Sequence, residues 1–202
     1  MDTIPYRSNR RGWTLIQRRL DGSIGFDRGM QDYLNGFGYP SGEHWIGLTN
    51  IRAITIQRNV AFFGKAVRPA IRIDLEDWDG IKNFIEHESF TISPGISGFH
   101  IHLLGVRYGM LGMDVLGGEI ATDFSTQDRR TGYCRGKWCV GSRTGGWWFG
   151  SRLASNLNGV YQKQNETMKH THMHIKHWDK INPRNAALRF VSIKLQLPRK
   201  RV

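Results

Sequence analysis

Half of the eight histidines gather in one short segment near the C-terminus. If residues 170–174 are extended, alternate side chains face the same way, so three imidazoles would point to one side, as a metal or pH-sensing site requires. No carboxylate or thiolate stands between positions 170 and 177, and this favours the alternative of a solvated edge or loop. The four residues are His170, His172, His174 and His177.

A second group of reactive side chains is acidic, and its spacing resembles the paired carboxylates of acid–base enzymes. It consists of Asp74, Glu76, Asp77 and Asp79. A nucleophile with an adjacent base is not found in the sequence. We therefore expect no enzymatic activity and no cofactor.

The chain has two cysteines, Cys134 and Cys139. They could form a disulfide across the four intervening residues, provided that their Cα atoms approach within about 7 Å. Two free buried thiols are an equal alternative, and zinc held by two cysteines alone is a weaker one.

Three adjacent aromatic residues, Trp147, Trp148 and Phe149, stand between glycines in residues 145–150, which we call the aromatic loop. Three neighbouring rings cannot all enter one core unless the backbone turns tightly. Asn156 and Asn158, shortly after, can stabilise such turns by bonding to their own backbone. The loop is therefore expected to form a ligand pocket or a long-range packing centre, and a buried loop core is the plainer alternative.

The charge balance limits the partners. With 29 Lys plus Arg against 17 Asp plus Glu, the formal charge is +12, which favours polyanions such as sulfated glycans, acidic proteins, membranes or nucleic acid. Nucleic acid is disfavoured because no zinc-finger, helix-turn-helix or RNP pattern is present. A window of 18 apolar residues, as a membrane span needs, is also missing.

The sequence evidence on localisation is divided. The first five residues contain no apolar signal segment, which taken alone indicates the cytosol. Asn165, in the triplet Asn-Glu-Thr, is an N-glycosylation site if the protein is secreted.

The elements that must position these residues form one domain of 202 residues, with 39% hydrophobic residues. Strands are expected over 13–19, 71–75, 99–103 and 191–197, where apolar and polar residues alternate. Asp27 is expected to cap a short helix that Gly36 ends, and a helical turn should carry Ile51 and Ile54. Few helices separate the strands, which favours an antiparallel sheet. Residues 104–187 show almost no periodicity and are expected to be loop-rich.

Several blocks of sequence together resemble the fibrinogen C-terminal domain family over nearly the whole chain. The resemblance implies a single α+β domain over residues 1–202, with a mostly antiparallel twisted sheet, short helices and a loop-rich C-terminal half. It further implies a secreted, non-enzymatic recognition module, often oligomeric, that binds acetylated sugars, peptide knobs or receptors. The blocks are Gly12–Arg19, Gly42–Leu48, Asp74–Gly80, Phe124–Asp128, the aromatic loop and Ser155–Gly159.

Departures from the family pattern bear on the site. In the calcium loop of the family, Asp128 is retained but Arg130 replaces the second acid, so calcium is not expected. The pocket of the family lies beside a disulfide whose first cysteine matches Cys139, whereas its second would fall at Arg152. The corresponding tentative pocket here consists of Arg143, Trp147, Trp148, Ser151, Arg152 and Leu153.

The resemblance also implies that the first strands and an N-terminal cysteine pair are missing and that residues 58–67 are an insertion. The leading hypothesis is an extracellular module that binds a protein receptor or an anionic or sulfated glycan, and the resemblance makes a homo-oligomer an expectation to test. The alternatives are an acetyl-sugar-binding lectin and a truncated or degenerate product without a binding role.

Overall fold

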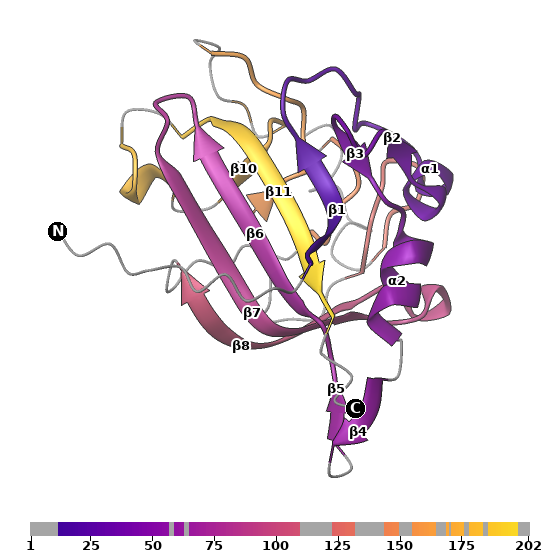
Figure 1. Cartoon of the computed structure of the whole chain (residues 1–202). Coiled ribbons are helices and arrows are strands. Elements are labelled where there is room, and N and C mark those ends of the chain that lie inside the picture. The colour runs from indigo at the N-terminus through magenta and orange to yellow at the C-terminus, as the bar shows by residue number, and fades with distance from the viewer. Residues whose placement is uncertain are drawn as a thin grey trace, which may run out of the picture.

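The computed structural model describes residues 12–56, 59–62, 65–109, 123–131, 144–149, 155–164, 169, 171–175, 178–183 and 186–197. Within these ranges a seven-stranded antiparallel sheet forms the centre of the fold, in the order β2-β3-β1-β11-β6-β7-β8 (Figure 1). Its strands are β1 Thr14–Arg19, β2 Phe37–Gly38, β3 His44–Trp45, β6 Ala70–Asp77, β7 Lys82–Ile92, β8 Ile101–Gly109 and β11 Leu188–Gln196. The expected antiparallel α+β architecture is thus confirmed.

The two central strands follow the predicted alternation. In β6 the residues Ile71, Ile73 and Leu75 are buried, and Ile73 stands directly opposite Ile193 of β11. Cross-strand pairs of β-branched residues are favourable on a pleated surface. This inner face forms the floor of the hydrophobic core.

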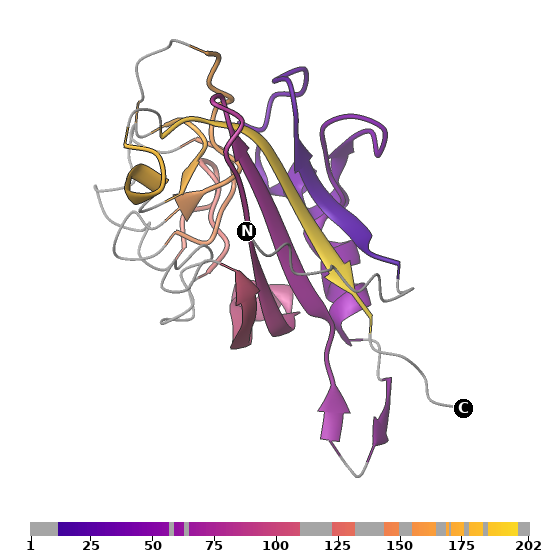
Figure 2. The ribbon, with the colours of Figure 1, turned by 60° about the vertical axis from the view of Figure 1, so that its left-hand side comes forward.

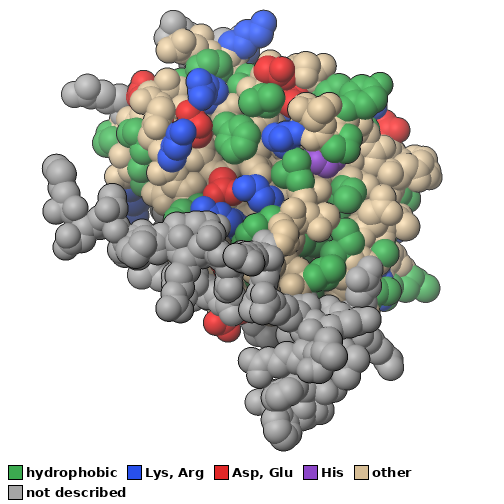
Figure 3. Space-filling model, viewed as in Figure 1, with side chains coloured by type: hydrophobic (Ala, Val, Ile, Leu, Met, Phe, Trp, Pro, Cys, Tyr) green, Lys and Arg blue, Asp and Glu red, His purple; other side chains and the backbone are tan. Residues whose placement is uncertain are grey.

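The outer face of the same strands carries charges that neutralise one another. Arg72 bonds to Asp74 at 2.7 Å, and Lys194 of β11 lies 2.8 Å from the same carboxylate. Figure 3 shows basic and acidic side chains close together over this face. The alternation therefore sorts the sheet into an apolar inner face and an ion-paired outer one.

Strand β7 was not predicted, although it is the longest of the sheet at 11 residues. Its pairing with β8 shifts register between Glu86 and His87. The buried face therefore has odd-numbered residues such as Ile85 before the shift and even-numbered residues such as Phe90 after it. A period-2 search fails on such a strand. Phe99, which was assigned to the next strand, precedes β8 with a φ of 55°.

Two helices pack beside the first strands. Helix α1 (Met30–Asn35) ends at Gly36, whose φ is 93°, as expected. Helix α2 (Leu48–Ile56) contains the predicted Ile51 and packs against α1 and β7. The capping prediction was wrong, because Gly29 is the N-cap and no side chain of the local sequence bonds to the helix end.

Part of the suspected insertion forms a hairpin of its own. Strand β4 (Asn59–Phe62) pairs with β5 (Lys65–Val67) in a separate two-stranded sheet. Figures 1 and 2 show this hairpin projecting beyond the end of the central sheet. Whether it is an insertion relative to the family stays a prediction.

The second half of the described chain is mostly loop. Between β8 and β11 it contains the two-residue strands β9 (Ser155–Asn156) and β10 (His174–Ile175) and the 3-10 turn η4 (Trp178–Lys180), whereas the 3-10 turn η1 (Gly95–Ser97) precedes β8. Figure 2 shows its described segments gathered on one side of the sheet. They close the core over the inner face.

Candidate recognition site

The aromatic loop is a packing centre. Trp147 is 0% exposed, Trp148 is 3% exposed, and the two rings meet edge to face at 5.4 Å. The Trp148 indole donates to the carbonyl of Phe99 at 2.7 Å. These contacts give the two indoles a packing role in the described structure, and their part in a ligand pocket stays a prediction.

Close packing dictates the glycines of this loop. Gly145 has a φ of 73°, and a Cβ there would collide with the carbonyl of Asn158. The Asn158 amide in turn donates to the carbonyl of Gly146 at 2.8 Å. The local bond that the residue type predicted is made by Asn156, whose side-chain oxygen accepts the backbone N–H of Asn158 at 3.1 Å.

A buried arginine, Arg19, connects the first strand to the segment that follows the aromatic loop and pairs with Glu43. Arg19 of β1 donates to the carbonyl of Gly159 at 2.7 Å, and its guanidinium lies 3.9 Å from the centroid of the Phe26 ring. Its Nε is 3.6 Å from the Glu43 carboxylate, and both side chains are at most 1% exposed. Burial lowers the pKa of Arg19, while Glu43 opposes that shift.

Glu43 also organises the turn after β1. Its two carboxylate oxygens accept the backbone N–H groups of Leu20, Asp21, Gly22 and Ile24 at 2.8–3.3 Å. A single carboxylate therefore determines the path of residues 20–24. This turn forms one wall of an open groove.

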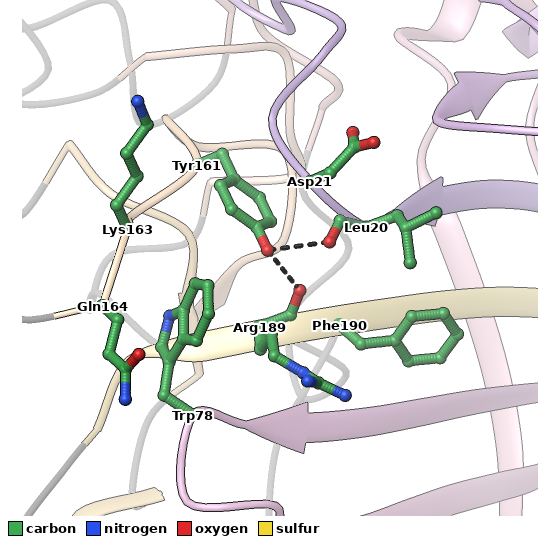
Figure 4. Close-up of a pocket in the computed structure, with 8 residues that line it drawn as sticks. All are labelled: Leu20, Asp21, Trp78, Tyr161, Lys163, Gln164, Arg189 and Phe190. Atoms are coloured by element: carbon green, nitrogen blue, oxygen red, sulfur yellow. Dashed lines mark hydrogen bonds between the residues drawn. The ribbon is translucent and has the colours of Figure 1, made fainter.

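The groove, which we call the Trp78 groove, has a volume of about 690 Å³. Figure 4 shows the rings of Trp78 and Tyr161 next to each other, with Lys163 and Gln164 on one flank and Leu20, Asp21 and Phe190 on the other. Four distant segments supply its lining residues, which are Leu20, Asp21, Trp78, Tyr161, Lys163, Gln164, Arg189 and Phe190.

Hydrogen bonds fix both rings. The Tyr161 hydroxyl lies 2.8 Å from the carbonyl of Leu20 and 2.7 Å from that of Arg189, and these two acceptors share its single O–H donor (Figure 4). The Trp78 indole donates to the carbonyl of Gln162 at 3.2 Å, and the two rings meet edge to face at 6.3 Å. Burial raises the pKa of Tyr161 to about 12, so the hydroxyl remains a donor at neutral pH.

Asp77 supports the groove from below. It is fully buried and accepts the Trp178 indole at 3.0 Å and the Asn182 amide at 2.9 Å. It also accepts the backbone N–H of Ile81 at 2.9 Å. The acidic run that resembled a catalytic pair therefore includes a structural carboxylate with its acceptor sites filled.

Asp128, the retained acid of the calcium loop, caps helix α1. Its carboxylate accepts the backbone N–H of Met30 at 3.0 Å and the hydroxyl of Thr126 at 2.6 Å. The Thr126 hydrogen bond is the main cause of the lowered pKa of Asp128. Arg129 and Arg130 beside it are exposed. The binding of calcium here is not tested by these contacts, and its absence stays a prediction.

Replacing Asp128 with alanine is expected to destabilise the domain by about 0.5–2 kcal/mol, because the first N–H of α1 loses its acceptor. Asp128→Asn retains an acceptor oxygen and should cost less. Thermal unfolding of both variants measures the difference. Millimolar calcium should leave the melting temperature of the unaltered chain unchanged, and a calcium-dependent rise would show that the loop still binds the ion.

His172 and His174, the described members of the C-terminal histidine group, bond locally. His172 is buried, and its Nδ1 accepts the backbone N–H of Lys169 at 3.1 Å. The Nδ1 of His174 bonds to the carbonyl of His172 at 2.8 Å. Within the part of the chain that the structure describes, no group of three metal-binding side chains comes together. His170 and His177 lie outside that part.

Several predicted site residues also lie outside the described ranges, so their positions remain predictions. They are the pocket residues Arg143, Ser151, Arg152 and Leu153, the cysteines Cys134 and Cys139, and the sequon residue Asn165. None of the helices that the structure describes is long and apolar enough to cross a membrane.

A second hollow, of about 440 Å³, lies beside β2 and β3 and includes the buried His44. Among the residues that the structure describes, the Nδ1 of His44 has no hydrogen-bond partner. Burial, assisted by Arg18, lowers the pKa of His44 below 6.5.

This shift predicts a loss of stability in acid. As the pH falls below 6.5, the unfolded chain takes up a proton at His44 that the folded chain resists, so the free energy of unfolding decreases. His44→Phe should weaken this pH dependence. Melting temperatures of both proteins at pH 7.5 and 5.5 provide the measurement, and equal drops in the two would exclude His44 as a cause.

Comparison with known proteins places this geometry among related folds. A family model described as "Fibrinogen beta and gamma chains, C-terminal globular domain" matches residues 5–198. Angiopoietin-2 of Sus scrofa is 39% identical over 155 residues, which cover 77% of this chain and 29% of the relative. Angiopoietin-1 of Homo sapiens is 40% identical over 156 residues, 76% of this chain and 28% of the relative. The chain thus spans less than a third of the length of these relatives.

Solved structures agree. The fibrinogen-like globe domain of human ANGPTL6 has a TM-score of 0.79 at 28% identity, with 96% of this chain and 81% of that chain covered. Lamprey fibrin D-dimer in complex with the peptide Gly-His-Arg-Pro-amide has a TM-score of 0.72 at 26% identity, with 93% and 62% covered.

Proposed function

Because the chain belongs to the family of the C-terminal globular domain of fibrinogen beta and gamma chains, we propose that it is an extracellular, non-enzymatic module that recognises a protein. The angiopoietins and ANGPTL6 are the relatives that support this setting. The lamprey fibrin structure, solved with a peptide ligand, supports the recognition of polypeptide by this fold.

The observation that carries the proposal is the Trp78 groove. Protein interfaces place aromatic residues at their centre and charged residues at the rim. Trp78 and Tyr161 form such a centre, while Asp21, Lys163 and Arg189 supply charges of both signs around it. Rings fixed in advance lose little conformational entropy when a partner binds.

An anionic glycan is the second candidate, and the charge of +12 favours it. The two functions differ in which cell-surface component they need. The labelled chain is incubated with a panel of animal cell lines after trypsin or after heparinase treatment. Protein recognition predicts that cell binding is lost after trypsin and retained after heparinase. Glycan recognition predicts that cell binding is lost after heparinase, and that the chain is retained on a heparin column in the presence of a chelator.

The acetyl-sugar alternative has its own signature. It predicts retention on N-acetylglucosamine resin and elution by a chelator, and neither is expected here because Arg130 stands in the calcium loop. A degenerate product would bind none of these materials and would show no cooperative thermal transition. Homo-oligomer formation also stays a prediction, which sedimentation of the chain would test.

A further inference from the structure

We propose that the Trp78 groove binds an acidic peptide segment that packs an apolar side chain on Trp78 and Tyr161 and places a carboxylate against Arg189. This inference rests on the proposed recognition of a protein and specifies the chemistry of the bound segment. It assigns the contact to the junction of the first strand, the end of β6, residues 161–164 and the start of β11.

The floor of the groove is suited to an apolar side chain. Three backbone carbonyls hold the two rings, so neither ring can turn away without losing a hydrogen bond. Leu20, beside them, is 42% exposed and adds apolar surface to the groove. An inserted aromatic or aliphatic group would cover this surface, and each buried methylene would contribute favourably.

The rim of the groove has an excess of positive charge. Arg189 donates to Glu76 at 2.6 Å, and Lys82 lies 3.7 Å from the other oxygen of the same carboxylate. Two cations therefore share one acid, and Glu76 is only 14% exposed while Arg189 is 49% exposed. Guanidinium has five N–H donors, and Glu76 occupies one part of this fork. Glu76 thus orients Arg189 and leaves donors for a second carboxylate.

The mixture of charges favours a peptide over a sulfated polymer. Asp21 stands on the opposite wall of the groove, and Glu76 lies beside Arg189. Closely spaced sulfates would approach both acids and be repelled. A peptide can place one carboxylate on Arg189 and direct a backbone N–H or a neutral side chain toward Asp21.

Nuclear magnetic resonance of the full ¹⁵N-labelled chain tests the proposal. The probe is acetyl-Asp-Phe-Asp-amide, and the comparison peptides are acetyl-Lys-Phe-Lys-amide and acetyl-Asp-Ala-Asp-amide. We expect the first peptide to shift the indole N–H signal of Trp78, which Trp78→Phe identifies by its disappearance. The affinity should exceed that of either comparison peptide.

Matched variants separate charge from fold. Arg189→Gln should weaken binding of acetyl-Asp-Phe-Asp-amide about tenfold, because it removes a charge-assisted hydrogen bond. Lys180→Gln makes the same charge change at an exposed position outside the groove and should have no effect. Equal weakening by both variants, or equal affinity for the lysine peptide, would overturn the proposal. A larger Trp78 shift with a heparin disaccharide than with the peptide would also overturn it, in favour of a glycan.

The cell-binding experiment distinguishes the two levels of inference. If the peptide fails to bind while trypsin-sensitive cell binding persists equally in Arg189→Gln, the groove assignment is wrong and protein recognition stands. If trypsin-sensitive binding is absent although the peptide binds at Trp78, the groove chemistry stands and the proposed function fails.

Discussion

Glu43→Ala is expected to destabilise the domain by about 3–5 kcal/mol, the cost of breaking a buried ion pair from one side. The substitution would leave Arg19 charged and fully buried, with its nearest carboxylate gone. It would also remove the shared acceptor of four backbone N–H groups in residues 20–24. Urea unfolding followed by circular dichroism measures the loss, and the altered turn should also change the Leu20 wall of the Trp78 groove.

Two comparison variants show which part of this effect belongs to the charge. Glu43→Gln retains an acceptor oxygen and a similar volume, so it should recover part of the turn and leave Arg19 unpaired. The double variant Arg19→Met with Glu43→Leu removes both charges. Its loss of stability should be smaller than the sum of the losses caused by the two single replacements. If Glu43→Ala cost less than 1 kcal/mol, the pair would not be a determinant of the fold.

The part of the fold that the sequence predicted is the part governed by local periodicity. Around Ile73 and Ile193 apolar and polar residues alternate in the sequence, and the apolar residues of both stretches are buried. Strand β7 escaped detection because its register shift at His87 changes which parity is buried. A local pattern cannot reveal such a shift, since it is set by pairing with β8.

The capping of helix α1 likewise depends on contacts between residues that are far apart in the sequence. Asp27 stood at the expected position for a cap, yet its carboxylate accepts the backbone N–H of Gly145, 118 positions away. Asp128 supplies the helix cap from a separation of 98 positions. Both acids were recognisable as candidates by type, but their partners are determined by tertiary packing.

The candidate site could be predicted only in fragments. The aromatic loop was detected by its composition, but residue types alone do not decide between a pocket wall and a packing centre. The Trp78 groove joins segments as far apart as Leu20 and Arg189. Trp78 lies in the block Asp74–Gly80, whereas Tyr161 follows the block Ser155–Gly159, and no local signal placed the two rings against one another.

The packing role of the aromatic loop leads to the second large prediction. Trp148→Ala is expected to cost about 3–5 kcal/mol, because it opens a cavity in the core and leaves the carbonyl of Phe99 without its donor. The ring also packs edge to face against Phe124 at 4.8 Å, which joins the aromatic loop to the segment that contains Asp128. Loss of the ring should therefore loosen the cap of α1 as well.

Trp148→Phe separates the ring from the indole N–H. It retains most of the apolar volume but loses the hydrogen bond to Phe99, so it should lower the free energy of unfolding by about 1–3 kcal/mol. The control is Tyr39→Ala, at a position that is 72% exposed, and it should change this free energy by no more than about 0.5 kcal/mol. Denaturant unfolding gives all three values, and hydrogen exchange at the Met30 amide reports on the helix cap. Faster exchange at Met30 in Trp148→Ala but not in Tyr39→Ala is expected, because the cap depends on the position of Asp128. A loss below 1 kcal/mol for Trp148→Ala would mean that the ring does not hold these segments together, and unchanged exchange at Met30 would mean that the cap is independent of it.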